Sequence, residues 1–147
     1  MPDHPKAVGD RSEAHVLAAL VDHFPTVLTP WGENCRYDFV VETDDGELLR
    51  IQCKTGRLRR GAILFHTSSF TYHHPKHEGR GTVEHCSKGY EGDVDLFAVY
   101  CPDTRGVYLV PLDDVPASGG TLRVAPTKNG QHARIRWAAQ YELHPPE

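Results

Sequence analysis

The chain has 147 residues, of which 39% are hydrophobic and 24% charged, and its formal net charge is −4 at pH 7. This length suffices for one domain with a real core and is too short for two, so we expect a single domain over residues 1–147. The composition is that of an ordinary soluble globular protein, and no apolar run approaches the roughly 20 residues that span a bilayer, which argues against a membrane protein.

The cysteines and the N-terminus indicate a cytoplasmic protein. The four cysteines, at positions 35, 53, 86 and 101, are widely spaced and form no Cys-x-x-Cys pair. Cys53 and Cys101 lie in apolar stretches, as is typical of reduced, buried thiols. The first six residues lack the apolar core of a signal peptide.

The first predicted element is a helix that begins at Asp10 or Ser12 and ends near His23. Pro25 stops it, and residues 1–8 before it are expected to be loosely packed. Its predicted apolar stripe consists of Leu17, Leu20, Val21 and Phe24.

Glu13 in this helix has two interpretations. It lies one turn before Leu17, so its side chain leans toward the apolar stripe rather than into solvent. Asp10 and Glu13 also have the spacing of a capping box, in which Glu13 would only stabilise the start of the helix. Position along the helix leaves both interpretations open.

A short strand over residues 26–30 leads to the most informative stretch, a predicted β-hairpin. Two apolar runs, over residues 36–42 and 49–55, are separated by a turn-forming segment. Three polar residues interrupt these runs: Asp38 in the first strand, and Gln52 and Lys54 in the second.

The length of the turn decides whether these three side chains meet. Gln52 and Lys54 are two residues apart and therefore share one face of their strand. A two-residue turn would direct Asp38 to the opposite face. A three-residue loop over residues 44–46 pairs Asp38 with Gln52 and gives Gly46 the left-handed position of that loop. We predict the three-residue loop, with a carboxylate, an amide and an ammonium group on one face.

The second half of the chain predicts a further set of strands, over residues 62–65, 95–100, 107–110 and 134–137. The second and third of these form a hairpin, and a short helical turn is expected over residues 111–115. Residues 67–92 are expected to form a long polar, basic and histidine-rich loop or a partly helical insertion. Tyr141 and Leu143 are expected to dock the tail.

Basic residues concentrate in one segment. Residues 50–90 hold eight lysines and arginines against Glu78 and Glu84, a net charge of +6 that leaves −10 for the remainder. A basic zone on an acidic body is expected of a surface that contacts the phosphate backbone, although a solvated loop has the same composition. Its position directly after Lys54 favours the first interpretation. The candidate DNA-binding residues are Arg11, Arg57, Arg59, Arg60, Lys76, Arg80 and Lys88.

The same segment contains a possible zinc site formed by His73, His74, His77, His85 and Cys86. His74 and His77 have suitable spacing, but the neighbours His85 and Cys86 would rarely bind one ion together. A loop of phosphate-contacting and solvated side chains is the preferred interpretation. Asp93 and Asp95, which follow it, could each be a further acid of the site, but Gly92 and Asp93 are explained more simply by turn formation.

The pattern of Asp38, Gln52 and Lys54, with Glu13 upstream, resembles the PD-(D/E)XK nuclease superfamily, in the variant where Gln replaces the second acid. Within it, the chain is most similar to the small endonucleases associated with group I introns. The resemblance extends from residue 9 to residue 111 and covers most of the chain. It implies an α/β, restriction-endonuclease-like core, in which a mixed central sheet carries an antiparallel catalytic hairpin and is flanked by helices on both faces.

The resemblance also implies a chemistry, the hydrolysis of DNA phosphodiester bonds with Mg²⁺, for which Mn²⁺ can substitute. Asp38 would be the principal metal ligand, Gln52 and Glu13 would add to the metal site, and Lys54 would lie beside the scissile phosphate. A neutral amide at position 52 lowers the negative charge, so metal binding would be weaker and would depend more on Glu13. A homo-oligomer, dimer or tetramer, is expected because one small domain has one site for the two strands of duplex DNA.

Other functions fit parts of the same pattern. A Holliday-junction resolvase or repair nuclease would use this chemistry on branched DNA. A DNA-binding module would remain if Gln52 had abolished cleavage, and a structural protein would bind no nucleic acid. For Gln52 and Lys54 taken alone, an exposed strand face with ordinary alternating polar residues is the preferred explanation.

Overall fold

The computed structural model describes residues 4–32, 34–73, 84–130 and 134–144, with main chain only for 70–73 and 84–87. The described part contains one α-helix, ten strands and two 3-10 turns. In chain order these are α1 (Pro5–His23), β1 (Thr26–Leu28), β2 (Phe39–Glu42), β3 (Leu48–Thr55), β4 (Arg57–Arg59), β5 (Ala62–Phe65), β6 (Ser68–His73), β7 (Glu84–Gly89), β8 (Leu96–Cys101), β9 (Gly106–Pro111), a 3-10 turn (Leu112–Asp114), β10 (Gly120–Arg123) and a second 3-10 turn (Ala138–Gln140).

Helix α1 begins earlier than the sequence pattern predicted. His4 caps it by accepting a hydrogen bond from the Lys6 amide, and Pro5 occupies the first turn, where its fixed φ favours the helix. Asp10 therefore lies inside the helix, so the capping box is wrong, as is the expectation that all of residues 1–8 are loose. The predicted end at His23 is confirmed.

The predicted apolar stripe of α1 is only partly correct. The buried line consists of Ser12, Val16 and Leu20, which are four residues apart and face the sheet. Leu17 and Val21 remain 37% and 58% exposed, whereas Phe24 of the predicted stripe is partly buried against the core that contains Val16 and Leu20. Glu13 lies beside this row and is half-buried.

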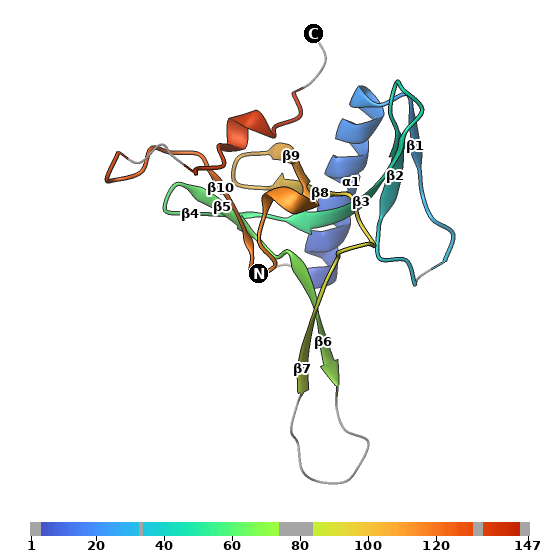
Figure 1. Ribbon diagram of the computed structural model, residues 1–147, viewed down its shortest axis with the longest axis horizontal. Helices are drawn as coiled ribbons and strands as arrows, with labels where there is room; N and C mark the ends of the chain where they lie inside the picture. Colours follow the sequence, from blue (N-terminus) through green and yellow to red (C-terminus); the bar gives the residue numbers. More distant parts are fainter. Residues whose placement is uncertain (1–3, 33, 74–83, 131–133, 145–147) are drawn as a thin grey trace.

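The central sheet has the strand order β1-β2-β3-β8-β9. Its β3–β8 pair is parallel and its other pairs are antiparallel, so the predicted mixed sheet is confirmed. Figure 1 shows α1 running along one face of this sheet. There Val16 and Leu20 pack with Ile51 and Ala98.

The other face of the central sheet differs from the prediction of helices on both sides. Phe97 and Val99 of β8 pack there against Ile63 and Leu122. Ile63 and Leu122 belong to a second, three-stranded sheet with the order β10-β5-β4. In the part of the chain that is described, this small sheet covers the face where a second layer of helices was expected.

The register of the β2–β3 hairpin is the one predicted. Phe39 pairs with Ile51, which places Asp38 opposite Gln52. The Thr43 amide donates to the Glu47 carbonyl at 2.8 Å, and the three-residue loop between them contains Gly46 with φ of 83°. The turn therefore directs Asp38 to the face that carries the polar side chains of β3.

Residues 67–92 are not a plain loop. Strands β6 and β7 pair in antiparallel fashion from Ser68 opposite Gly89 to His73 opposite Glu84. Figure 1 shows this two-stranded hairpin projecting away from the central sheet. Alternating Phe70 and Tyr72 explain the strand, because aromatic residues favour extended backbone.

The C-terminal segment also differs from the prediction. Residues 134–137 form no strand of their own; Trp137 makes an isolated bridge to Arg123, and Arg134 has a left-handed φ of 60° that interrupts an extended run. The tail is docked as expected, since the Leu109 amide donates to the Tyr141 carbonyl at 2.9 Å. Within the described residues no helix is long and apolar enough to cross a membrane.

Candidate active site

The candidate site lies where β3 runs past the start of β2. Because Phe39 is the first residue of β2 and pairs with Ile51, residues 52–55 of β3 pair with a strand on one side only, that of β8. The N-terminal half of α1 lies beside this free edge. A cavity of about 280 Å³ wraps around it, lined by Lys6, Gly9, Asp10, Ser12, Glu13, Asp38, Gln52, Cys53, Lys54 and Thr55.

All four predicted catalytic residues line this cavity. Glu13 enters it from α1, on one face of the sheet. Lys54 enters from the opposite face, where it reaches Tyr90. Ser12 Oγ and Thr55 Oγ1, 2.6 Å apart, join α1 to the end of β3 and hold the two sides together.

Asp38 is fixed by two main-chain hydrogen bonds. Its amide donates to the Ile51 carbonyl at 2.8 Å. Its carboxylate oxygen Oδ2 accepts from the Cys53 amide at 2.8 Å and so caps the free edge of β3. An N–H group that would otherwise lack a strand partner thus orients the carboxylate toward the cavity.

Glu13 and Asp38 form a close pair of carboxyl groups. Partial burial raises the pKa of Glu13, and the negative charge of Asp38, a hydrogen bond with Asp38 and the charge of Asp10 raise it further. A cation between the two carboxyl groups would offset the unfavourable burial and charge that raise the pKa of Glu13. Their mutual repulsion is the electrostatic property expected of a cation site.

The oxygen donors of the cavity suit a hard divalent cation. Two carboxylates and the amide oxygen of Gln52 are the ligand types that Mg²⁺ prefers, and Mg²⁺ keeps several of its waters. Gln52 is anchored by its Nε2, which donates to the Cys53 carbonyl at 3.4 Å. In the described part of the chain, no three His, Cys, Asp or Glu side chains gather as a metal site, so the third protein donor would have to be this amide.

Lys54 is held by an aromatic residue rather than by an acid. Its Nζ donates to the Tyr90 hydroxyl at 2.9 Å and lies 4.6 Å from the centre of the ring. Among the described residues it makes no ion pair with Glu13 or Asp38. The ammonium charge is therefore available to an anion that enters the cavity.

Cys53 behaves as a neutral thiol. Burial raises its pKa strongly, and the negative charges of Asp38 and Glu13 raise it further. A thiol that stays protonated is neither a nucleophile nor a thiolate ligand for a metal. Among the described residues, Cys35, Cys53 and Cys101 form no disulfide.

Lys6 and Asp10 line the cavity although sequence reasoning did not select them. With the helix beginning at Pro5, positions 6, 10 and 13 follow the spacing that places side chains on one face. The signal was Pro5 itself, which favours the first turn of a helix. A helix that begins at Asp10 does not contain Lys6, so the predicted helix could not place Lys6, Asp10 and Glu13 on one face.

The predicted DNA-binding residues lie outside the cavity lining. Arg57 and Arg59 are exposed on one side of β4, and Arg60 is exposed in the following turn with φ of 50°. Arg11 is exposed on α1, and Lys88 is exposed on β7. Lys76 and Arg80 lie outside the described residues, as do His74 and His77 of the possible zinc site; the side chains of His73, His85 and Cys86 are also not described.

The two further acids that the sequence offered do not line the cavity either. Asp95 pairs with Arg50, whose amide and guanidinium both donate to it, and this lowers the pKa of Asp95. Asp93 lies 3.5 Å from Arg36. Both acids serve ion pairs.

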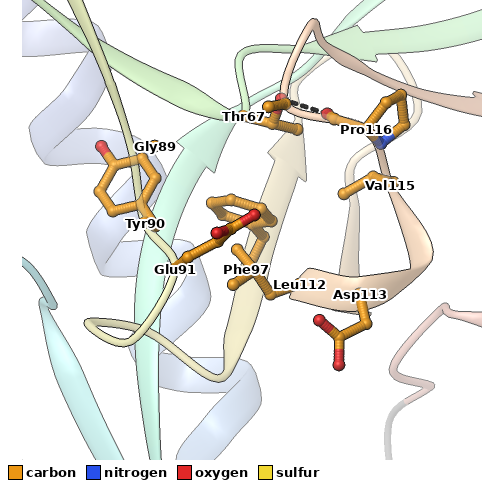
Figure 2. Close-up of a pocket in the computed structure, with 10 residues that line it drawn as sticks. Thr67, Gly89, Tyr90, Glu91, Phe97, Leu112, Asp113, Val115 and Pro116 are labelled. Carbon is orange, nitrogen blue, oxygen red and sulfur yellow. Dashed lines mark hydrogen bonds between the residues drawn. The ribbon is translucent and has the colours of Figure 1, made fainter.

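A second cavity, of about 250 Å³, is lined in part by Tyr90 (Figure 2). Phe97 and Leu112 contribute apolar lining, and Glu91 and Asp113 contribute carboxylates. It contains no basic side chain among its lining residues, so it offers nothing to a phosphate group. The first cavity is therefore the candidate active site.

Comparison with known proteins agrees with this assignment of the fold. A family model described as PD-(D/E)XK endonuclease matches residues 3–144. Among solved structures, the chain is similar to a bacterial homing endonuclease, I-Ssp6803I, with a TM-score of 0.62 and 21% sequence identity over 95% of this chain and 89% of that chain. At this identity the likeness concerns the fold. No curated protein matches the chain.

Proposed function

The chain belongs to the PD-(D/E)XK endonuclease family, and from this premise we propose that it hydrolyses phosphodiester bonds of DNA with the help of a divalent cation. The observation that carries the proposal is the convergence of Glu13, Asp38, Gln52 and Lys54 on one cavity at the free edge of β3. An ordinary exposed strand face explains Gln52 and Lys54, but it does not explain why Glu13 and Asp38 line the same cavity, with Asp38 raising the pKa of Glu13.

Glu13, Asp38 and Gln52 would hold the cation through their oxygen atoms. Mg²⁺, or Mn²⁺ in its place, neutralises phosphate charge and supplies an activated water when bound. Asp38 is the best-fixed of the three, because the Cys53 amide orients its carboxylate. Glu13 supplies the second negative charge that the amide of Gln52 lacks.

Lys54 would act on the phosphate. As water attacks phosphorus and the bond to the leaving oxygen breaks, negative charge develops on the phosphoryl oxygens. An ammonium that is not neutralised by a carboxylate can donate hydrogen bonds to those oxygens and stabilise that charge. Its fixed place on the Tyr90 hydroxyl means that little reorganisation is needed during the reaction.

For the substrate we propose double-stranded DNA, cut at specific sites. The structural neighbour is described as a homing endonuclease, and the projecting β6–β7 hairpin could enter a groove of the duplex. Exposed Arg57, Arg59 and Lys88 would contact phosphates. A dimer or tetramer would supply the second site that the second strand requires.

A cleavage assay tests this function. The parent protein and its Asp38→Asn and Lys54→Ala variants would be incubated with Mg²⁺ or Mn²⁺ and a randomised duplex library, a supercoiled plasmid and a four-way junction, with sequencing of the ends. We expect the parent to cut duplex DNA, and each variant to be slower by on the order of 100-fold or more. Asp22→Asn, which removes an exposed acid of α1 outside the cavity, is the matched control and should cut like the parent.

The substrate arms separate the competing functions. Preferential cutting of the junction would identify a resolvase of the same chemistry. A parent that binds DNA but cuts none of the three substrates would be a DNA-binding protein, and the proposed hydrolysis would be wrong. Equal cleavage rates for the parent and both variants would show that this cavity is not the site of hydrolysis.

A further inference from the structure

Tyr90 is a buried aromatic residue that lines the second cavity and contacts Lys54, a lining residue of the candidate active site. Its side chain is only 5% exposed, and its ring forms a wall of the second cavity. In Figure 2 its hydroxyl group points away from the other labelled lining residues of that cavity. The hydroxyl oxygen accepts a hydrogen bond from Lys54 Nζ at 2.9 Å and so reaches the candidate active site.

The Tyr90 ring is fixed by two neighbours. Phe97 meets it edge to face, with ring centres 5.6 Å apart and an angle of 85°. The Arg36 guanidinium lies over the ring, 4.1 Å from its centre, in cation–π geometry. The position of the hydroxyl group is therefore set before any substrate binds.

Arg36 is itself anchored at the base of the β6–β7 hairpin. Its guanidinium donates to Ser69 Oγ at 2.7 Å and to the Gly89 carbonyl at 2.6 Å. Its buried Nε lies 3.5 Å from Asp93, an ion pair without the alignment of a hydrogen bond. Since Arg36 stands two residues before Asp38, one residue connects the hairpin, the Tyr90 ring and the start of the catalytic hairpin.

Lys54 needs such a fixed partner. A lysine side chain has a flexible four-carbon stem, and holding its ammonium in one place costs conformational entropy. Within the described residues, the Tyr90 hydroxyl is the one hydrogen-bond partner of Lys54 Nζ, and neither carboxylate of the cavity pairs with it.

We infer that Tyr90 is the positioning residue of Lys54: its hydroxyl group, fixed by Arg36 and Phe97, holds the ammonium where the scissile phosphate enters the cavity. This inference rests on the proposed function for the role of Lys54. In this role Tyr90 does not contact the reacting atoms. Loss of its hydroxyl group therefore lowers the rate of hydrolysis in the enzyme–DNA complex and leaves the affinity for DNA unchanged.

The variant Tyr90→Phe removes the hydroxyl and keeps the ring. We expect kcat to fall about 10- to 100-fold with KM unchanged, because a misplaced catalytic group costs rate and not affinity. In a Lys54→Ala background the same substitution should have no further effect. Tyr108→Phe is the control, since it removes another buried hydroxyl, bonded to Thr104 at 2.9 Å, and should leave kcat unchanged.

A second readout does not depend on cleavage. With ¹³C-labelled lysine, the order parameter of the Lys54 Cε group should fall in Tyr90→Phe and stay at the parent value in Tyr108→Phe. An unchanged order parameter in Tyr90→Phe, or a kcat equal to that of the parent, would overturn the inference. If the parent cut no DNA, the proposed function would fail, and the order parameter would still decide whether Tyr90 holds Lys54.

Discussion

At the scale of single residues, the proposed cation site depends on the pair Glu13 and Asp38. A protein gains nothing in stability from two carboxyl groups at the free edge of a strand unless something positive lies between them. Burial raises the pKa of Glu13 most, and the negative charge of Asp38 raises it further, so the ionised form of Glu13 is disfavoured at this position. The pair is therefore better explained by function than by folding.

Glu13→Gln tests this cost through the pH dependence of stability. A carboxyl whose pKa is raised in the folded state binds more protons there than in the unfolded chain, so parent stability falls as pH rises from about 4.5 through the folded pKa. Without metal, the variant should therefore melt higher than the parent at pH 7, by on the order of 2 °C, with the difference vanishing below about pH 4.5.

Calorimetry with and without Mg²⁺ completes the test. Mg²⁺ should raise the melting temperature of the parent at pH 7 and should raise that of Glu13→Gln much less, because the variant lacks one charged ligand. A variant that is less stable than the parent at pH 7 without metal would contradict the repulsion between Glu13 and Asp38.

The residues of the site differ in how far the sequence alone could predict their positions. Asp38, Gln52 and Lys54 could be placed together from strand period and turn length alone. Whether Glu13 caps the helix or belongs to the site could not be decided from the sequence, because the answer depends on the residue at which the helix begins. Tyr90 was not selected, because it contacts Lys54 across 36 positions of the chain and no local pattern marks that contact.

At the scale of elements, the β2–β3 turn determines the site. Shortening the loop over residues 44–46 by one residue, through deletion of Asp45, should favour a two-residue turn and shift the pairing of Asp38. We expect cleavage to be lost and the free energy of unfolding to fall by roughly 1–3 kcal/mol, because side chains change faces. Denaturant unfolding and the cleavage assay measure both effects.

The variant Gly46→Ala distinguishes the effect of backbone strain in the turn from the effect of a changed strand register. With φ of 83°, alanine at this position is strained and should cost about 1 kcal/mol, while the loop length and the cleavage rate stay unchanged. Full activity in the deletion variant would show that the register does not determine the site.

The elements that the sequence predicted well are those with strong local chemistry. Turn residues and alternating polar positions determined the β2–β3 hairpin, and Pro25 determined the end of α1. Strand β10 was missed because its partner, β5, lies more than 50 residues earlier in the chain. The β6–β7 hairpin was mistaken for a loop because histidine and charged residues conceal its aromatic alternation.

At the scale of the whole molecule, the sheet has two different faces. Helix α1 supplies Glu13 from one face, and the side with the small sheet supplies Lys54 and Tyr90. The site can combine groups from both faces only because β3 extends beyond β2. The mixed sheet could be predicted from the family resemblance, whereas the nature of its second covering layer depended on pairings between distant segments.

The most direct test of the central claim is diffraction from a crystal of the protein soaked with Mn²⁺. We expect an anomalous peak in the cavity within about 2.0–2.3 Å of carboxylate oxygens of both Glu13 and Asp38, with the Gln52 amide oxygen in reach. The peak should be absent in an Asp38→Asn crystal soaked in the same way. An empty cavity in the parent, or a peak bound only elsewhere, would contradict the account.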